Sequence, residues 1–305
     1  MGDTKQWTSK SMGTRFGHNF FYLMVKIGGR RAAYFVLYFI VFYYVIFHQA
    51  VKIKTEPYLT RRFPKTSGIK RILQRYQLVL NFGKALVDRA ILGILGQASI
   101  HMDFEYEADI KKIRSLNSGF ILLMSHVGCW QGVMSALPEL GKPVNLLMYR
   151  DEQDIDKHYF EHGQKGTPFN IINPDQFLGG TIEMLKVLQN DEILCIMGDR
   201  VFKSAEFTIK VDFLGKPAGF PLLAYKMASI SGKPIVVLHS HKRGPDQYSL
   251  SIPEIIYVRK KLGKDRKVYM PYVTKFIASL EAYTQRFPYQ FFNFYDMWKE
   301  SVEPK

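Results

Sequence analysis

Short apolar runs alternate with helix-period segments along the chain from about residue 117 onward. Each run ends in turn residues and is apolar enough to form a buried strand. The predicted strands are Gly119 to Met124, Val144 to Tyr149, Ile193 to Met197 and Pro234 to His239. Strands that alternate with helices predict an α/β fold whose sheet is covered on both faces.

Two of the intervening segments carry apolar side chains at helical spacing, which predicts one apolar face on each helix. The first face consists of Leu178, Ile182, Leu185 and Leu188. The second, near the end of the chain, consists of Tyr272, Phe276, Leu280, Tyr283 and Phe287.

The stretch from Ala32 to Phe47 carries no charge, and basic residues flank it on both sides. A full membrane crossing takes about 20 apolar residues. This run is somewhat shorter and rich in Tyr, a residue favoured at the bilayer interface. We predict a membrane-associated helix, and a spanning, a tilted and a shallow orientation all fit. A buried core helix is the alternative. The basic and mixed residues 48–75 suit a linker on an anionic surface.

The charge balance is strongly basic, with 42 Lys and Arg against 27 Asp and Glu and a net charge of +15. Such a charge attracts anionic lipid headgroups, nucleic acid or an acidic carrier protein, and by itself it does not choose among them. Cys129 and Cys195 lie far apart and form no C-x-x-C pair, so neither a zinc ribbon nor a disulfide framework is indicated.

A candidate for acid–base chemistry follows the first predicted strand, in the segment SHVGCWQ from Ser125 to Gln131. Open α/β sheets place their active sites at the carboxyl ends of buried strands. His126 therefore stands where a general base is useful, beside Gly128, which lets a ligand approach the backbone. A histidine that is merely satisfied in a loop is the alternative for an isolated His.

Several further blocks follow this segment in a fixed order, and together they resemble the lysophospholipid acyltransferase superfamily. SHVGCWQ is similar to the H-x-x-x-x-D/E block of glycerolipid acyltransferases, and most similar to the S-H-x-G-N-W-E form of the late lipid A acyltransferases. The other blocks are Met148-Tyr149-Arg150, Gly198-Asp199-Arg200, Phe213 to Pro221 (FLGKPAGFP), Gly232-Lys233-Pro234 and the aromatic ending FPYQFFNFYDMWK. The order and spacing match over roughly residues 7–299. An ordered set is far more specific than one block.

This resemblance implies a mixed sheet covered by helices, with residues 1–55 as a membrane-anchoring segment and residues 56–305 as an acyltransferase domain. It implies transfer of a fatty acyl group from an acyl carrier protein or coenzyme A thioester to a hydroxyl or amine of a membrane lipid. The acceptor is a lipid A precursor or a lysolipid-like molecule, and the site of action is the cytoplasmic side of a bacterial inner membrane. No metal or bound cofactor is required.

The same resemblance suggests roles for individual residues. His126 is the general base. Arg150 and Arg200 are candidates to hold phosphate, although Arg200 could instead pair with an acid and brace the sheet. Asp199 braces a loop or orients an active-site group. Gly215 and Pro217 belong to a candidate substrate-binding loop, which places Pro221 at a predicted helix start, where free backbone N–H groups bind anions.

Gln131 departs from the family pattern, because the family has a carboxylate at this position. A carboxylate accepts the second imidazole N–H and stabilises the imidazolium, whereas an amide carries no charge. Three interpretations follow: a slower enzyme, an enzyme that borrows a carboxylate from elsewhere, or a non-catalytic lipid-binding protein attached to the membrane.

Other patterns suggest rival chemistry. His158 and His162 fit the H-x-x-E-H pattern of zinc metalloproteases, a short motif that recurs by chance. Cys129 could serve as an acyl-enzyme nucleophile, although a buried thiol is the simpler role. His239 and His241 share one face of a predicted strand and line either the site or a solvated edge. The charge permits nucleic-acid binding, but no known binding motif is present and a membrane segment argues against it.

Overall fold

The computed structural model describes residues 15–95, 99–148, 169–174, 180–201 and 207–299. Within these residues the main sheet has seven strands in the order β1-β9-β8-β2-β5-β3-β4. They are β1 (His101–Phe104), β2 (Phe120–Met124), β3 (Val144–Leu147), β4 (Asn170–Ile172), β5 (Ile193–Met197), β8 (Ile235–Lys242) and β9 (Gln247–Ile256). β8 and β9 pair antiparallel and the other neighbours pair in parallel. The sheet is mixed, as predicted.

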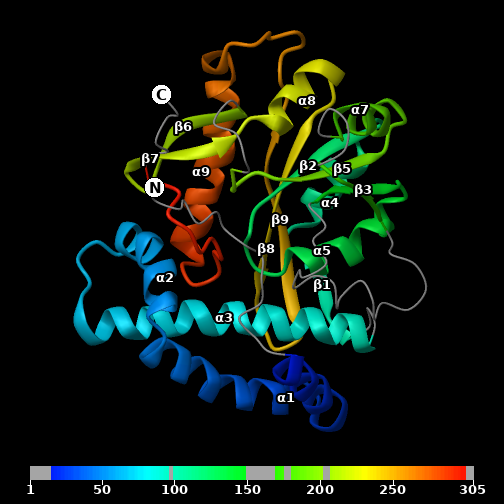
Figure 1. The fold of residues 1–305 in the computed structure, drawn as a ribbon. Coiled ribbons are helices and arrows are strands. Elements are labelled where there is room, and N and C mark those ends of the chain that lie inside the picture. Colours follow the sequence, from blue (N-terminus) through cyan, green and yellow to red (C-terminus); the bar gives the residue numbers. More distant parts are fainter. Residues whose placement is uncertain (1–14, 96–98, 149–168, 175–179, 202–206, 300–305) are drawn as a thin grey trace.

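Helices cover both faces of this sheet (Figure 1). They are α1 (Arg15–Phe47), α2 (Gln49–Arg62), α3 (Gly68–Leu95), α4 (Glu107–Arg114), α5 (Trp130–Ala136), α7 (Thr181–Gln189), α8 (Leu223–Ser231) and α9 (Met270–Arg286), with 3₁₀ turns η2 (Leu137–Leu140) and η5 (Arg266–Tyr269). Because side chains alternate along β2, Phe120 and Leu122 join the core of α4 and α5, while Ile121 and Leu123 join that of α7, α8 and α9. The four predicted strands are confirmed, β5 with both of its predicted ends.

The predicted apolar face of α9 is confirmed, and that of α7 is confirmed only in part. On α9, Phe276, Leu280 and Tyr283 are buried as expected. On α7, Ile182 is 55% exposed, and the buried positions are Met184, Val187 and Leu188. The prediction is therefore confirmed at Leu188 and, in part, at Leu185, which packs partly buried against the same core, and it is wrong at Ile182. Leu178 lies outside the described residues.

The predicted linker over residues 48–75 is wrong, because most of it is helical. Gln49–Arg62 forms α2 in spite of Pro57, which removes one backbone donor. Tertiary contacts supply what the local sequence does not: the buried Tyr58 donates a hydrogen bond from its hydroxyl to the carbonyl of Pro288, 2.8 Å away.

The segment predicted as a substrate-binding loop with a helix start at Pro221 is instead part of a β-hairpin. β6 (Thr208–Phe213) pairs antiparallel with β7 (Lys216–Pro221), and α8 begins at Leu223. Leu214 and Gly215 make the turn with positive φ angles of 51° and 76°. The sequence of β7 does not predict a strand, because its glycine and prolines are typical of turns.

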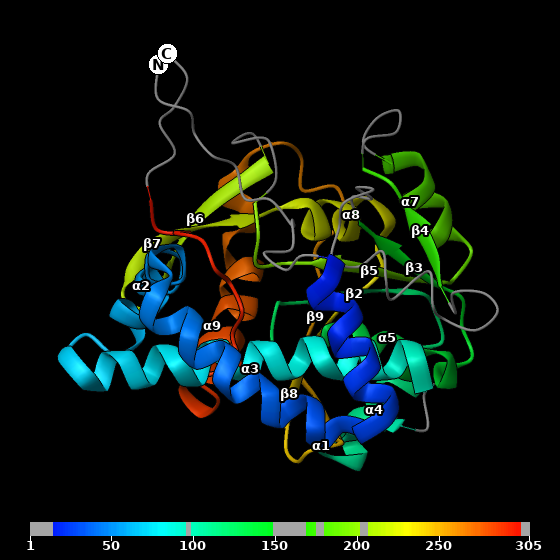
Figure 2. The same cartoon turned by 60° about the horizontal axis from the view of Figure 1, so that its bottom comes forward.

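α1 lies along the outer side of α3, and α3 itself runs across the end of the sheet (Figures 1 and 2). The two helices approach closely at Gly83, where a Cβ would come within 2.8 Å of the Leu37 side chain. α1 bends at Gly29, whose φ of 64° is outside the helical region. Among the described residues, one helical segment, Met24–Phe47, is long and apolar enough to cross a membrane.

A buried carboxylate holds α1 and α3 to the sheet. The side chain of Asp88 on α3 is fully buried and receives four contacts. Arg30 and Tyr34 of α1 reach one oxygen at 3.2 and 2.6 Å, while Lys242 of β8 and Tyr248 of β9 each reach the other at 2.6 Å. Removing one member of such a buried cluster leaves the remaining charges uncompensated.

We therefore expect Asp88→Asn to lower the free energy of unfolding by about 3–5 kcal/mol, measured by urea denaturation. Asp246→Asn is the matched control, because Asp246 lies 4.0 Å from Arg30 but is 44% exposed. It should cost less than about 1 kcal/mol. Equal losses in the two variants would contradict the central role of Asp88.

Candidate active site

Two loops meet at the carboxyl ends of the central strands β2 and β5. The strands pair in parallel with Met124 opposite Met197, so the residues that follow them are brought side by side. The backbone N–H of Gly198 donates to the carbonyl of Met124 at 2.7 Å and continues this pairing into the loops. His126 follows β2 and Asp199 follows β5, so neighbouring strands deliver these two side chains to one place.

Asp199 binds His126 through both carboxylate oxygens. Oδ1 lies 2.8 Å from the ring nitrogen Nδ1, and Oδ2 accepts the backbone N–H of His126 at 3.0 Å. An ionised carboxylate can only accept hydrogen bonds, so Nδ1 carries the proton and Nε2 is left as the basic nitrogen. The His126 side chain is 15% exposed, whereas that of Asp199 is fully buried.

The charge of Asp199 is maintained in spite of its burial. Burial alone would raise the pKa of this carboxyl group, but His126 and the charge of Arg200 outweigh it, and the pKa falls below its ordinary value. Asp199 is therefore ionised at neutral pH and can hold a protonated His126 ring.

Close packing fixes the His126 loop against β8. Gly128 has a φ of 56°, and a Cβ there would lie 2.2 Å from the carbonyl oxygen of Ser240. The Ser240 hydroxyl accepts the N–H of Cys129 at 3.2 Å and donates to the carbonyl of Val127 at 3.1 Å. A side chain at position 128 would push the loop away from the sheet and displace His126.

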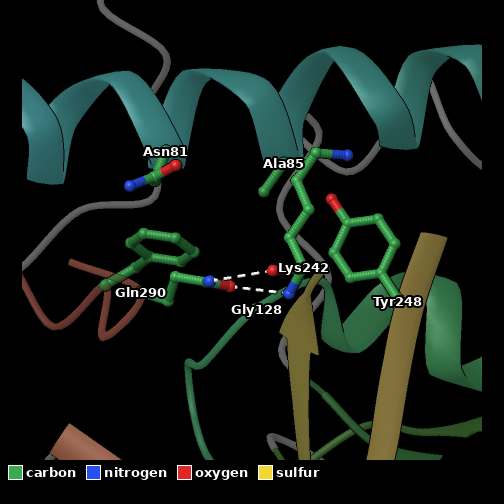
Figure 3. Close-up of a pocket in the computed structure, with 7 residues that line it drawn as sticks. Asn81, Ala85, Gly128, Lys242, Tyr248 and Gln290 are labelled. Carbon is green, nitrogen blue, oxygen red and sulfur yellow. Dashed lines mark hydrogen bonds between the residues drawn. The ribbon is translucent and has the colours of Figure 1, made fainter. Parts of the chain in front are cut away.

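A small recess lies between α3 and this loop, lined by Asn81, Ala85, Gly128, Lys242, Tyr248, Gln290 and Phe292. Figure 3 shows that Lys242 and Gln290 meet there through paired hydrogen bonds between the Gln290 amide and the Lys242 backbone, of 2.7 and 3.2 Å. The end of β8 is thus joined to the segment that follows α9.

The other predicted site residues do not all lie at the His126–Asp199 pair. Arg200 is buried and donates to the Asn293 side chain and the Phe292 carbonyl. Gly215 and Pro217 lie at the turn and on the exposed start of the β6–β7 hairpin. The backbone of Gln131 lies in the first turn of α5. The Gln131 side chain and the whole of Arg150 lie outside the described residues.

The rival patterns gain no support from the described residues. Burial raises the pKa of the Cys129 thiol to about 12, so little nucleophilic thiolate exists at neutral pH. His158 and His162 lie outside the described residues, within which no group of three or more His, Cys, Asp or Glu side chains is placed to hold a metal ion. His239 and His241 do share a face, but both are buried against aromatic rings of the α9 region, not solvated at an edge.

Sequence reasoning missed the partners of the two loops. It left the role of Asp199 open, although an acid directly after a buried strand is itself a signal for a site. It also passed over Asn293 and Tyr295, polar groups in the aromatic ending FFNFYD, both of which donate to the backbone carbonyl of Asp199.

The fold is thus a helix-covered, largely parallel sheet with a His–carboxylate pair at the carboxyl ends of its central strands, the edge at which α/β enzymes place their active sites. The family model for the bacterial lipid A biosynthesis acyltransferases matches residues 4–300. The chain therefore belongs to the bacterial lipid A biosynthesis acyltransferase family, within the lipid acyltransferases.

Among solved structures, the chain is similar to the crystal structure of the 1-acyl-sn-glycerophosphate (LPA) acyltransferase PlsC from Thermotoga maritima. The two are 14% identical with a TM-score of 0.39, and the match covers 84% of this chain and 98% of the other. The comparison with curated proteins found no match.

The burial of His239, next to the site, should make stability depend on pH. Burial lowers its pKa from 6.5 to about 4, with Asp199 acting in the opposite sense, and within the described part of the chain Nδ1 has no hydrogen-bond partner. As pH falls below 6.5, the unfolded chain takes up this proton before the folded one, so stability is lost between pH 6.5 and about 4.

We expect this group to lower the free energy of unfolding by about 2 kcal/mol between pH 7 and pH 5, in urea titrations at each pH. The loss should be absent in His239→Gln and retained when the exposed His101 is changed to Gln. An unchanged pH dependence in His239→Gln would contradict a buried neutral His239.

Proposed function

We propose that this protein transfers a fatty acyl group from an acyl carrier protein or coenzyme A thioester to a hydroxyl or amine of a membrane lipid, with His126 as general base. The observation that carries the proposal is the His126–Asp199 pair, in which Nε2 is the basic nitrogen and the His126 side chain is 15% exposed. Family membership supplies the acyl-transfer chemistry.

In the proposed reaction, Nε2 of His126 takes the proton from the acceptor O–H or N–H as the acceptor atom attacks the thioester carbonyl. The tetrahedral intermediate collapses, the C–S bond breaks, and the imidazolium returns the proton to the leaving thiolate. Asp199 fixes the ring tautomer and stabilises the imidazolium, the role of the carboxylate in serine protease triads. No redox step or external oxidant is needed.

The contact between Asp199 and His126 also bears on the interpretation of Gln131. Of the three interpretations of that amide, the borrowed carboxylate agrees best with a 2.8 Å contact between Asp199 and His126. The alternative, a non-catalytic lipid-binding protein, was suggested by the missing family carboxylate, and the presence of Asp199 beside His126 favours the working enzyme.

The donor and the acceptor are proposed from charge and motif. A net charge of +15 favours an acidic carrier protein and anionic lipid, both of which present phosphate. Arg150 remains our candidate for a phosphate contact, since an Arg binds phosphate through paired hydrogen bonds. Gly215 and Pro217 remain candidates for contact with a substrate at the hairpin.

Acyl transfer from labelled acyl carrier protein and acyl-coenzyme A into total membrane lipid tests the function. We expect wild type to transfer, and His126→Ala and Asp199→Asn to lose on the order of 10³–10⁴-fold in rate. Gln131→Glu should be nearly as active as wild type. Asp103→Asn, on the exposed side of the edge strand β1, is the matched control and should leave the rate unchanged.

Two outcomes would contradict this assignment. Full activity in Asp199→Asn would remove Asp199 from the mechanism. Activity that appears only in Gln131→Glu would make the natural protein a lipid-binding protein on an acyltransferase fold.

We further propose that α1 attaches the protein to one leaflet of an anionic membrane and lies in its plane. Its inner face, with Ala33, Leu37, Val41 and Val45, packs along α3. Its outer face is also apolar, where a helix on a water-exposed surface carries polar residues. The exposed residues there are Ile27, Phe35, Tyr38, Phe39, Phe42, Tyr43, Ile46 and Phe47.

The packing of α1 argues against a spanning orientation. α1 contacts α3 along its length and is held by the Asp88 cluster, so lipid cannot surround it. Ile53 on α2, and Ile69 and Leu73 on α3, are further exposed apolar side chains on the neighbouring helices. Such a helix sinks roughly 5–10 Å into the headgroup and acyl boundary.

We expect Phe35→Glu with Phe39→Glu to abolish co-sedimentation with phosphatidylglycerol-containing vesicles, while Ile182→Glu, at an exposed Ile on α7, should bind like wild type. Depth is measured with Phe39→Trp and brominated lipids, as the difference from wild type. Quenching should be strongest with bromine near the headgroup. Strongest quenching at the chain ends would indicate a spanning helix, because Phe39 lies near the middle of the apolar segment.

A further inference from the structure

The C-terminal segment, residues 287–299, connects the two loops that carry His126 and Asp199. On the first loop, the N–H of Gly128 donates to the carbonyl of Gln290 at 3.1 Å. The N–H of Phe292 donates to the carbonyl of His126 at 2.7 Å. The segment therefore pairs with the His126 loop much as an added strand would.

On the second loop, side chains of the same segment reach the backbone of Asp199. The Asn293 amide donates to the Asp199 carbonyl at 3.0 Å, and the Tyr295 hydroxyl donates to the same oxygen at 3.2 Å. Asn293 is only 3% exposed, so its hydrogen bonds are formed without competition from water.

Arg200 also binds the C-terminal segment, through Asn293 and Phe292. Its Nε donates to the Asn293 side-chain oxygen at 3.0 Å, and one terminal nitrogen donates to the Phe292 carbonyl at 2.9 Å. The residue is 7% exposed. Two nitrogens of the guanidinium group thus donate to acceptors of the protein itself. The pair of N–H groups that could bind a phosphate is already used in these hydrogen bonds.

We infer that Arg200 and Asn293 form a positioning pair that holds Asp199 in line with His126, and that Arg200 does not serve as a phosphate contact. The inference rests on the proposed function, in which Asp199 orients the base. Asn293 uses its oxygen for Arg200 and its amide nitrogen for Asp199, so each residue depends on the other. The Arg200 charge also helps to keep Asp199 ionised.

A double-mutant cycle tests this pair. Arg200→Lys and Asn293→Leu should each lower kcat by roughly 10–100-fold, because small displacements at a catalytic centre have effects of this size. KM for the donor and for the acceptor should stay close to wild type. The double variant should be no slower than the slower single variant, since residues that act through one network are not additive.

Two conservative variants test the same segment with little risk to folding. Tyr295→Phe removes one of the two donors to the Asp199 carbonyl and should lower kcat slightly at unchanged KM. Tyr289→Phe is the matched control on the same segment, because that ring stacks on Phe63 and, among the described residues, no hydrogen bond joins its side chain to either loop. It should behave as wild type.

The pH–rate profile gives a readout that a purely structural role would not change. Arg200→Gln removes a positive charge near Asp199, so Asp199 becomes harder to ionise and the acid limb should move to higher pH. Arg200→Lys keeps the positive charge and should shift the acid limb of the profile less.

A measurement independent of turnover separates failure of this inference from failure of the proposed function. In protein labelled with ¹⁵N-histidine, the low-field Nδ1 proton of His126 reports its bond to Asp199. We expect this resonance in wild type, and an upfield shift or loss in Asn293→Leu, whether or not acyl transfer is detected. An unchanged resonance, or a raised acceptor KM at wild-type kcat in Arg200→Lys, would overturn the positioning pair.

Discussion

Asp199 carries a negative charge in a place from which water is excluded, and the surrounding structure is arranged to satisfy that charge. Both of its oxygens accept from His126, its backbone carbonyl accepts from Asn293 and Tyr295, and Arg200 lies close enough to lower its pKa. A buried carboxylate without such partners would take up a proton and could no longer stabilise an imidazolium. The His126–Asp199 pair therefore depends on contacts drawn from two loops and the C-terminal segment.

Parallel pairing explains how Asp199, far from His126 in sequence, comes into contact with the His126 ring. β2 and β5 are neighbours in the sheet, and their carboxyl ends meet at one edge. Residues that follow such strands become close regardless of their separation along the chain. In the function that we propose, this acid makes an amide at position 131 compatible with a working base.

The same edge of the sheet faces α3, and α3 separates it from α1 (Figure 2). The Asp88 cluster joins α1, α3, β8 and β9, while Lys242 in that cluster also pairs through its backbone with Gln290. The apolar outer surface of α1 and the His126 loop are thus fixed to one rigid unit. For a reaction on a membrane lipid, this keeps the base at a constant height above the surface that we propose for α1.

The sequence by itself determined the strands β2, β3, β5 and β8, because an apolar run bounded by turn residues has few other stable placements. It did not determine the other strands of the main sheet, β1, β4 and β9. It also determined the family and the position of His126, because the sequence blocks typical of the family occur in their usual order along the chain. It did not determine α2, the β6–β7 hairpin or the buried side of α7, where tertiary contacts override local preference. Only the tertiary structure decided that Asp199 is the partner of His126, that Arg200 is engaged by Asn293, and that α1 packs along α3. Each of these contacts joins residues far apart in sequence, and a linear pattern carries no information on which strand ends and side chains meet in space.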